Sequence, residues 1–182
     1  LPVDDLKSED AWNYGISFLQ NFNLFNKKSE IILDYYYTDF DNKVIVDWEN
    51  PYEISFYNLS GKSFAASFQS QFNYYINQNV ELKLAYKLYN VKTDYNSGRL
   101  TKPMTPKERL FINFNINSNL NDDGSQWKFD TTFNWIGEQR FSNRITNNPT
   151  FLPVDYEKFS PQFSTINAQL TRVFSEKFEV YL

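Results

Sequence analysis

The side chains able to do chemistry in this chain of 182 residues are carboxylates, tyrosines, lysines, arginines and hydroxyls, because the sequence contains no histidine and no cysteine. Those two absences exclude a Ser-His-Asp triad, thiol chemistry, a disulfide scaffold and an ordinary zinc site. Two carboxylates suffice to hydrolyse a glycosidic bond, but no acidic pair stands out in the sequence. We therefore predict a protein that is not an enzyme and that carries no cofactor.

Candidate ligand-binding residues lie in three long polar segments rich in proline. The arginines could attract an anionic ligand, and the aromatic rings could stack on a sugar or an aromatic ligand. Solubility explains the arginines more readily than a ligand does, and packing likewise explains the rings more readily. The candidates are Trp48, Tyr52, Arg99, Arg140, Arg144 and Tyr156.

Acidic residues gather just before and within the first of these segments. Carboxylates are ligands that Ca²⁺ accepts, but the spacing here matches no EF-hand loop, so we predict no metal site. The residues concerned are Asp39, Asp41, Asp47, Glu49 and Glu53.

The elements that must position these residues show a period of two, which is typical of strands with two unlike faces. Apolar residues occupy alternate positions most clearly in 64–76, 80–89, 110–117 and 127–135. Weaker alternation occurs in 12–24, in 31–37 with a possible extension to 48, and in 166–174, and a last strand begins at Phe178. No helical stripe of useful length is present. The pattern predicts an all-β protein.

The links between these strands alternate in length. Short links fall at 26–29, 77–79, 119–126 and 175–177, and long links at 49–62, 93–107 and 138–162. The link 119–126 contains Asp123-Gly124, a pair typical of hairpin turns. An antiparallel meander with short turns at one end and long loops at the other produces this alternation. No composition shift marks a domain boundary.

The two faces of the predicted strands differ in charge. The apolar face carries Arg172, whereas the opposite face carries Asp34, Glu81, Lys83, Lys87, Lys128 and Asp130. Strands of ten to sixteen residues with aromatic residues near their ends are typical of a transmembrane β-barrel. Arg172 would then reach the headgroups. The alternative is a soluble, aromatic-rich β-sandwich that binds carbohydrate. A net charge of −4 argues against nucleic acid as a partner.

The barrel hypothesis also predicts an orientation. Outer-membrane barrels keep short turns in the periplasm and long loops outside, so the six candidate ligand-binding residues would be extracellular. Glu81, Lys83, Lys87 and Asp130 would face a hydrated lumen, where they would contact a plug or pair with one another across strands.

Several runs of residues resemble one family. The chain resembles TonB-dependent outer-membrane receptors of the Bacteroidetes type over nearly its whole length. The resemblance is carried by Ala11-Trp12-Asn13-Tyr14-Gly15, Tyr37-Thr38-Asp39-Phe40, Val44-Ile45-Val46-Asp47-Trp48-Glu49-Asn50-Pro51, Thr93-Asp94-Tyr95-Asn96-Ser97-Gly98 and Phe163-Ser164-Thr165-Ile166-Asn167-Ala168-Gln169.

This resemblance implies an importer in the outer membrane of a Gram-negative bacterium. The chain would supply about eight strands, from the C-terminal part, of a 22-stranded barrel. Its partners would be membrane lipid, a small-molecule nutrient (a ferric siderophore, haem, cobalamin or an oligosaccharide) and the TonB system. The TonB system would act through a plug, which residues 1–182 do not include.

Overall fold

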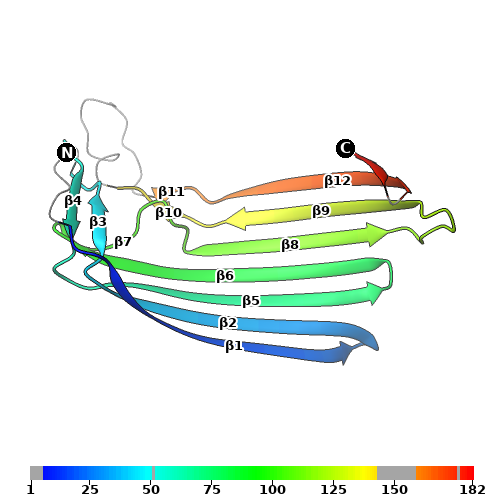
Figure 1. Cartoon of the computed structure of the whole chain (residues 1–182), viewed down its shortest axis with the longest axis horizontal. Coiled ribbons are helices and arrows are strands. Elements are labelled where there is room, and N and C mark those ends of the chain that lie inside the picture. The colour runs from blue at the N-terminus through cyan, green and yellow to red at the C-terminus, as the bar shows by residue number, and fades with distance from the viewer. Residues whose placement is uncertain (1–5, 51, 143–158, 176) are drawn as a thin grey trace.

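The chain forms one long antiparallel sheet with two small sheets at one end (Figure 1). This computed structural model describes residues 6–50, 52–142, 159–175 and 177–182. No helix occurs in those ranges, so the all-β prediction is confirmed. In spatial order the strands are β1 (Asp10–Leu24), β2 (Lys27–Asp41), β5 (Ser63–Asn77), β6 (Val80–Tyr95), β8 (Glu108–Asn117), β9 (Gln126–Ile136), β12 (Phe163–Ser175) and β13 (Phe178–Tyr181).

The eight strands follow chain order as an antiparallel meander, and the sheet formed by the described residues is open. Short turns join the strands at one end, as predicted. Phe25 and Asn26 connect β1 to β2 with φ of 49° and 60°, the positive values that a two-residue hairpin of type I′ requires. Gly124, at φ 78°, lies in the link between β8 and β9, as its Asp-Gly pair suggested.

The opposite end, called here the loop end, contains short strands that the sequence pattern missed (Figure 1). β3 (Val44–Asp47) pairs with β4 (Ser55–Asn58), and β7 (Gly98–Thr101) pairs with β6. β10 (Gln139–Arg140) pairs with β11 (Phe159–Ser160). The long links are therefore partly ordered into hairpins.

The second strand does not continue to Trp48, an extension that the sequence left open. β2 ends at Asp41, and Asn42 adopts a left-handed φ of 51°. Asparagine tolerates this conformation, which turns the chain away from the sheet. The backbone resumes as β3 at Val44, whose N–H donates to the Glu9 carboxylate at 2.7 Å.

Cross-strand register places the alternating apolar residues of all seven long strands on one face, called here the apolar face. Directly paired residues share a face in an antiparallel sheet. One row of such pairs crosses the sheet through Gln20, Ile31, Phe72, Leu84, Ile112, Phe133 and Ile166. The strands therefore run in phase across the sheet.

The opposite face, called here the polar face, is hydrogen-bonded across the strands. A row one residue away from the apolar row consists of Asn21, Glu30, Asn73, Lys83, Asn113, Thr132 and Asn167. The Asn73 amide donates to Glu30 at 2.6 Å, and the Asn113 amide donates to both oxygens of Asp130 at 3.0 and 2.9 Å. These contacts give the amide and carboxylate groups of the polar face hydrogen-bond partners within the sheet.

Formal charges on the apolar face are confined to the strand ends. The strands are longer than predicted, so this face carries more charges than Arg172 alone. They are Asp10, Asp39, Asp41, Lys92, Asp94 and Glu108 near the loop end, and Lys27 and Arg172 near the turns. The rows between these ends are uncharged in all seven long strands.

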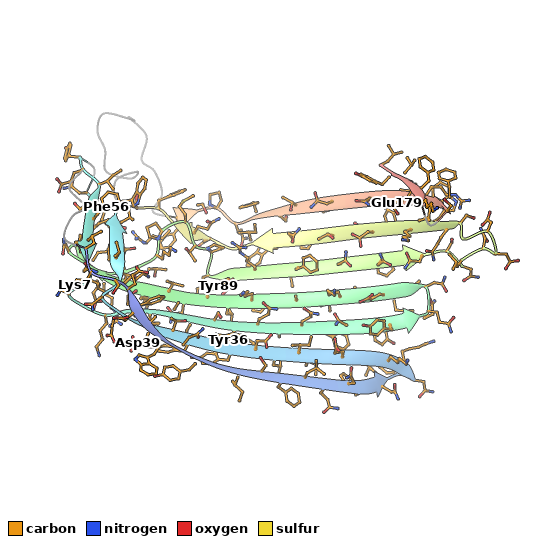
Figure 2. All side chains as sticks on the ribbon, viewed as in Figure 1. Lys7, Tyr36, Asp39, Phe56, Tyr89 and Glu179 are labelled. Carbon is orange, nitrogen blue, oxygen red and sulfur yellow. The ribbon has the colours of Figure 1, made fainter. Side chains whose placement is uncertain are left out.

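The long sheet has no hydrophobic core. Among the described residues, the buried hydrophobic side chains are Ile45 and Leu59, and both belong to the β3–β4 region at the loop end. Side chains project from both sides of the sheet (Figure 2). Ring pairs such as Tyr37–Phe64, with centroids 5.7 Å apart, stabilise neighbouring strands without covering the face.

A tight contact between β1 and β2 yields a test of this register. Gly15 pairs with Tyr36, and a Cβ added to Gly15 would lie 2.5 Å from the Tyr36 ring. We expect Gly15→Ala to lower the unfolding free energy by about 1 kcal/mol. In a Tyr36→Ser background the same change should be neutral or stabilising, because glycine weakens an unobstructed strand. Denaturant unfolding of the four proteins measures both effects; equal destabilisation in both backgrounds would contradict the register.

Candidate functional site

The loop end is where buried side chains and candidate ligand-binding residues meet. Ile45 and Leu59 are buried there, and the Leu59 N–H donates to the Lys43 carbonyl at 2.8 Å, which closes the β3–β4 hairpin. Two fully buried hydroxyls, those of Ser63 and Thr93, hydrogen-bond each other at 2.9 Å beneath this hairpin. Local packing therefore holds the loops against the end of the sheet.

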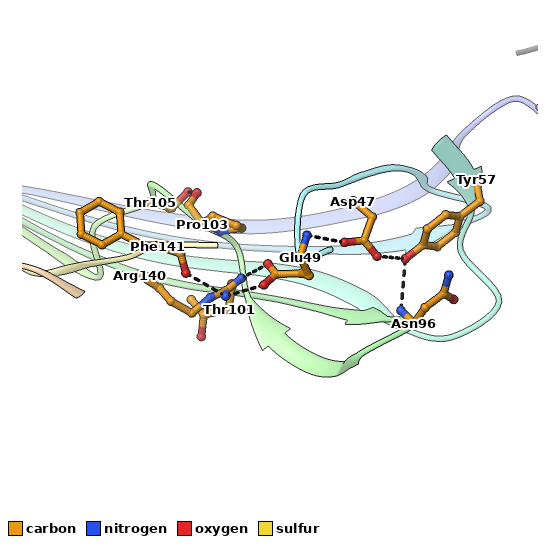
Figure 3. Close-up of polar contacts among 9 residues, drawn as sticks. All are labelled: Asp47, Glu49, Tyr57, Asn96, Thr101, Pro103, Thr105, Arg140 and Phe141. Carbon is orange, nitrogen blue, oxygen red and sulfur yellow. Dashed lines mark hydrogen bonds and ion pairs between the residues drawn. The ribbon is translucent and has the colours of Figure 1, made fainter. Parts of the chain in front are cut away.

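A buried ion pair joins two distant loops of this region (Figure 3). The Arg140 guanidinium donates to both oxygens of Glu49, at 2.6 and 3.0 Å, and the two side chains are 11% and 2% exposed. Arg140 also donates through Nε to the Thr101 carbonyl at 2.7 Å, and through Nη1 to the Phe141 carbonyl at 3.1 Å. One side chain thus ties together the segment after β3, the end of β7 and the β10 region.

A second hydrogen-bonded pair supports the first (Figure 3). Asp47 accepts from the Glu49 N–H at 2.8 Å and from the Tyr57 hydroxyl at 2.7 Å, while the Tyr57 oxygen accepts from the Asn96 N–H at 3.2 Å. Burial is the main cause that raises the pKa of Tyr57 to about 12, and the hydrogen bond to Asp47 adds to it. Tyr57 is therefore a neutral donor at physiological pH.

A cavity of about 470 Å³ opens beside this network. Its walls come from β3, the end of β6 and residues 102–104, and they include Val44, Val46, Trp48, Tyr95 and Met104. The volume lies within the range of about 300–1,000 Å³ typical of ligand pockets. Predominantly apolar walls are also typical of such pockets.

The predicted ligand-binding residues have different surroundings. Trp48 lines the cavity, whereas Tyr52 is 78% exposed and does not line it. Arg99 pairs with Asp94 at 3.5 Å and lies over the Phe64 ring, and Arg140 is held by Glu49. Arg144 and Tyr156 lie outside the described residues. The structure thus joins Arg140 to Glu49, the residue that follows Trp48, and ligand contact by any of the six remains a prediction.

The four residues expected to face a lumen, Glu81, Lys83, Lys87 and Asp130, share the polar face. Their role at a lumen or a plug remains a prediction, and none of them forms an ion pair with another within the described residues. The reason is register: Lys83 lies between two asparagines, and the side chain of Asp130 accepts from the Asn113 and Asn115 amides.

The acidic residues near β3 serve the loop network. Asp47 and Glu49 accept the hydrogen bonds described above. In the part of the chain that the structure describes, no group of three or more acidic side chains gathers in a way that could hold a metal ion. The same part contains no helix long and apolar enough to cross a membrane.

Sequence reasoning missed Lys43 and Met104 as members of this site. The Lys43 ammonium donates to the Ser63 hydroxyl at 3.2 Å and lies 4.4 Å from the Phe40 ring centroid. Burial, and then the charge of Lys102, lowers the pKa of Lys43. Met104 is the only methionine in the sequence and has a φ of 53°. No local pattern marks either residue, because both reach the cavity through contacts between distant loops.

No protein-family model matches the chain, and no curated protein shows significant similarity to it. The physical properties of the sheet and of the loop end are therefore the basis for a function.

The buried ion pair gives a second prediction. Arg140→Gln should lower the unfolding free energy of the loop end by about 3 kcal/mol, because it leaves the Glu49 carboxylate buried without its partner. Hydrogen exchange of residues 44–58 should accelerate. Arg99→Gln is the matched control, since its exposed pair with Asp94 contributes no more than about 1 kcal/mol. Equal effects of the two changes would contradict a special role for Glu49–Arg140.

The Tyr57 hydroxyl gives a third prediction, on pH dependence. Its pKa is about 12 in the folded protein against 10.0 for an ordinary tyrosine. The raised pKa contributes stability that is fully present below pH 10 and is lost as the pH rises through 12. Unfolding midpoints measured between pH 9 and 12 should therefore fall less steeply in Tyr57→Phe than in the parent protein. Identical slopes would show that the hydroxyl is not held by Asp47 as described.

Proposed function

We propose that the chain is an arc of a transmembrane β-barrel in the outer membrane of a Gram-negative bacterium. The observation that carries this proposal is the apolar face, which is uncharged between its two ends. It continues in phase across seven long strands, and no second layer of the described residues covers it. Exposed apolar patches of ordinary soluble monomers cover a few hundred Å². Lipid is the solvent in which such a face is stable.

The height of this face agrees with a bilayer. β5 carries no charged residue, and its apolar-face residues before the register shift at Tyr75/Asn77 run from Phe64 to Tyr74, ten residue steps, or about 33 Å along the strand. At the tilt of about 40° found in barrels, this length spans about 25 Å of membrane, the height of the apolar band in outer-membrane proteins. On the neighbouring strand β6 the uncharged residues of the apolar face run from Val80 to Asn90, which is the same number of steps.

Side chains at the two ends of the band suit the two membrane interfaces. Near the turns, the Arg172 guanidinium lies over the rings of Trp127 and Phe174, at 5.1 and 5.4 Å. A cation packed on aromatic rings at the margin of an apolar band can reach the headgroups while its stem stays in the lipid. Near the loop end, Trp12 pairs across the strands with Asp39, where the charged residues begin.

The polar face suits the lining of a hydrated lumen. Its asparagines, glutamines and charged residues bond to one another and leave further donors and acceptors for water. Each outer edge, at β1 and along much of β12, is unpaired within the described residues, and a closed barrel would pair these edges with further strands. The described strands would then form part of a larger wall.

The cargo follows from the resemblance to TonB-dependent receptors. We propose that the barrel takes up a scarce nutrient without chemical change, with energy from the TonB system acting through a plug elsewhere in the protein. Support comes from the lumen-like polar face and from a loop end that combines a ligand-sized cavity with ordered hairpins. A soluble β-sandwich would need a second sheet against the apolar face, and the described residues provide one layer.

Lipid contact can be tested with the four tryptophans of the chain. In vesicles of phosphatidylcholine with brominated acyl chains, a variant that keeps Trp135 alone should lose most of its fluorescence, because Trp135 lies on the apolar face beside Leu110. A variant that keeps Trp48 alone is the matched control and should stay bright, because Trp48 lies at the loop end. Unquenched Trp135, or a monodisperse monomer without detergent, would contradict the proposal.

A further inference from the structure

The cavity at the loop end combines two kinds of lining. One part is apolar and accessible: Trp48 is 47% exposed and Met104 is 60% exposed, although both are large hydrophobic side chains. The other part carries two ammonium groups, those of Lys43 and Lys102. An apolar wall beside paired positive charges is complementary to an amphipathic anion.

The two lysines leave a net positive charge at this part of the lining. Among the described residues, Lys43 donates one hydrogen bond, to the Ser63 hydroxyl, and its ammonium also lies 4.4 Å from the Phe40 ring centroid. Further N–H groups of the ammonium can therefore donate to a ligand. Lys43 and Lys102 are close enough to repel each other, which contributes to the lowered pKa of Lys43. Glu9 lies near Lys43 and offsets part of this charge, but one of its carboxylate oxygens accepts the Val44 N–H. A bound anion would relieve the repulsion that remains.

Met104 is held in position by the buried ion-pair network. Its left-handed φ of 53° is uncommon for a residue with a side chain, and such conformations persist where the surroundings enforce them. The enforcing contact is a hydrogen bond from the Met104 N–H to the Arg140 carbonyl at 2.9 Å. Because Glu49 anchors Arg140, the wall of the cavity is organised before any ligand arrives.

We propose that this cavity binds a small organic anion whose carboxylate meets Lys43 and Lys102 and whose aromatic or aliphatic body packs against Trp48 and Met104. The inference rests on the proposed function in taking the cavity as the external mouth of the barrel, since Thr93 and Tyr95 in its lining belong to the polar face. It names the chemical class of ligand that the mouth receives. A neutral sugar fits less well, because it would leave the two ammonium groups without an anionic partner.

The test uses 4-benzoylbenzoate, a carboxylate whose benzophenone group reacts on irradiation with nearby C–H bonds, those of methionine above all. The ketone carbon bonds to a methionine carbon, and the abstracted hydrogen passes to the ketone oxygen. Peptide mass spectrometry then reports the labelling of Met104. The uncharged 4-benzoylbenzamide has the same body and serves as the matched probe, so nonspecific partition into detergent affects both.

We expect the carboxylate to label Met104 roughly tenfold more than the amide at equal concentration, the effect of one charge-assisted contact. Lys102→Gln, which changes an exposed lysine, should remove most of this preference, and Lys43→Gln with Lys102→Gln should remove all of it. Lys62→Gln is the control: it removes the same charge at the same end of the sheet, from a residue that does not line the cavity.

Equal labelling by the two probes, or a preference that survives the double substitution in a protein with unchanged thermal unfolding, would overturn the ligand class. Quenching of Trp135 by brominated lipid, measured on the same preparation, separates this failure from failure of the barrel proposal. A quenched protein without the carboxylate preference is a membrane barrel whose mouth takes a different ligand. An unquenched protein with the preference has the anion site on a different kind of scaffold.

Discussion

In-phase pairing of the long strands is the constraint on which the rest of this structure depends. Side chains alternate between faces with a period of two, so a slip of one residue between any two strands would move a whole set of apolar residues to the polar face. The row from Ile31 through Leu84 to Ile166 shows that no such slip occurs among the paired long strands. One apolar face and one polar face result, and both the proposed membrane contact and the proposed lumen require them.

The two ends of the molecule are stabilised differently. In the long sheet, backbone ladders and cross-strand side-chain pairs act without a hydrophobic core, so the apolar face depends on its surroundings. At the loop end, buried Ile45 and Leu59 and the Glu49–Arg140 ion pair stabilise the hairpins from within. This division suits a protein whose strands lie in lipid and whose loops must hold a shape in water.

The ion pair also connects stability to the proposed binding site. Arg140 holds the Thr101 carbonyl through its side chain and the Met104 N–H through its backbone, so a buried electrostatic contact positions an exposed apolar residue of the cavity. An arginine that the sequence suggested as a ligand contact therefore acts through its neighbours. Its charge is matched by Glu49, and the lysines supply the positive charge that faces the cavity.

The sequence by itself determined the long strands, their phase and the alternation of short and long links, because each follows from a local period of two and from turn residues such as Asp123-Gly124. The tertiary structure decided that β2 stops at Asp41, that Asp130 bonds to amides and that Glu49 meets Arg140. It also decided that Lys43 and Met104 share a cavity. Glu49 and Arg140 are 91 positions apart, and contacts over such distances depend on how loops fold back over the sheet, which leaves no periodic trace in the chain.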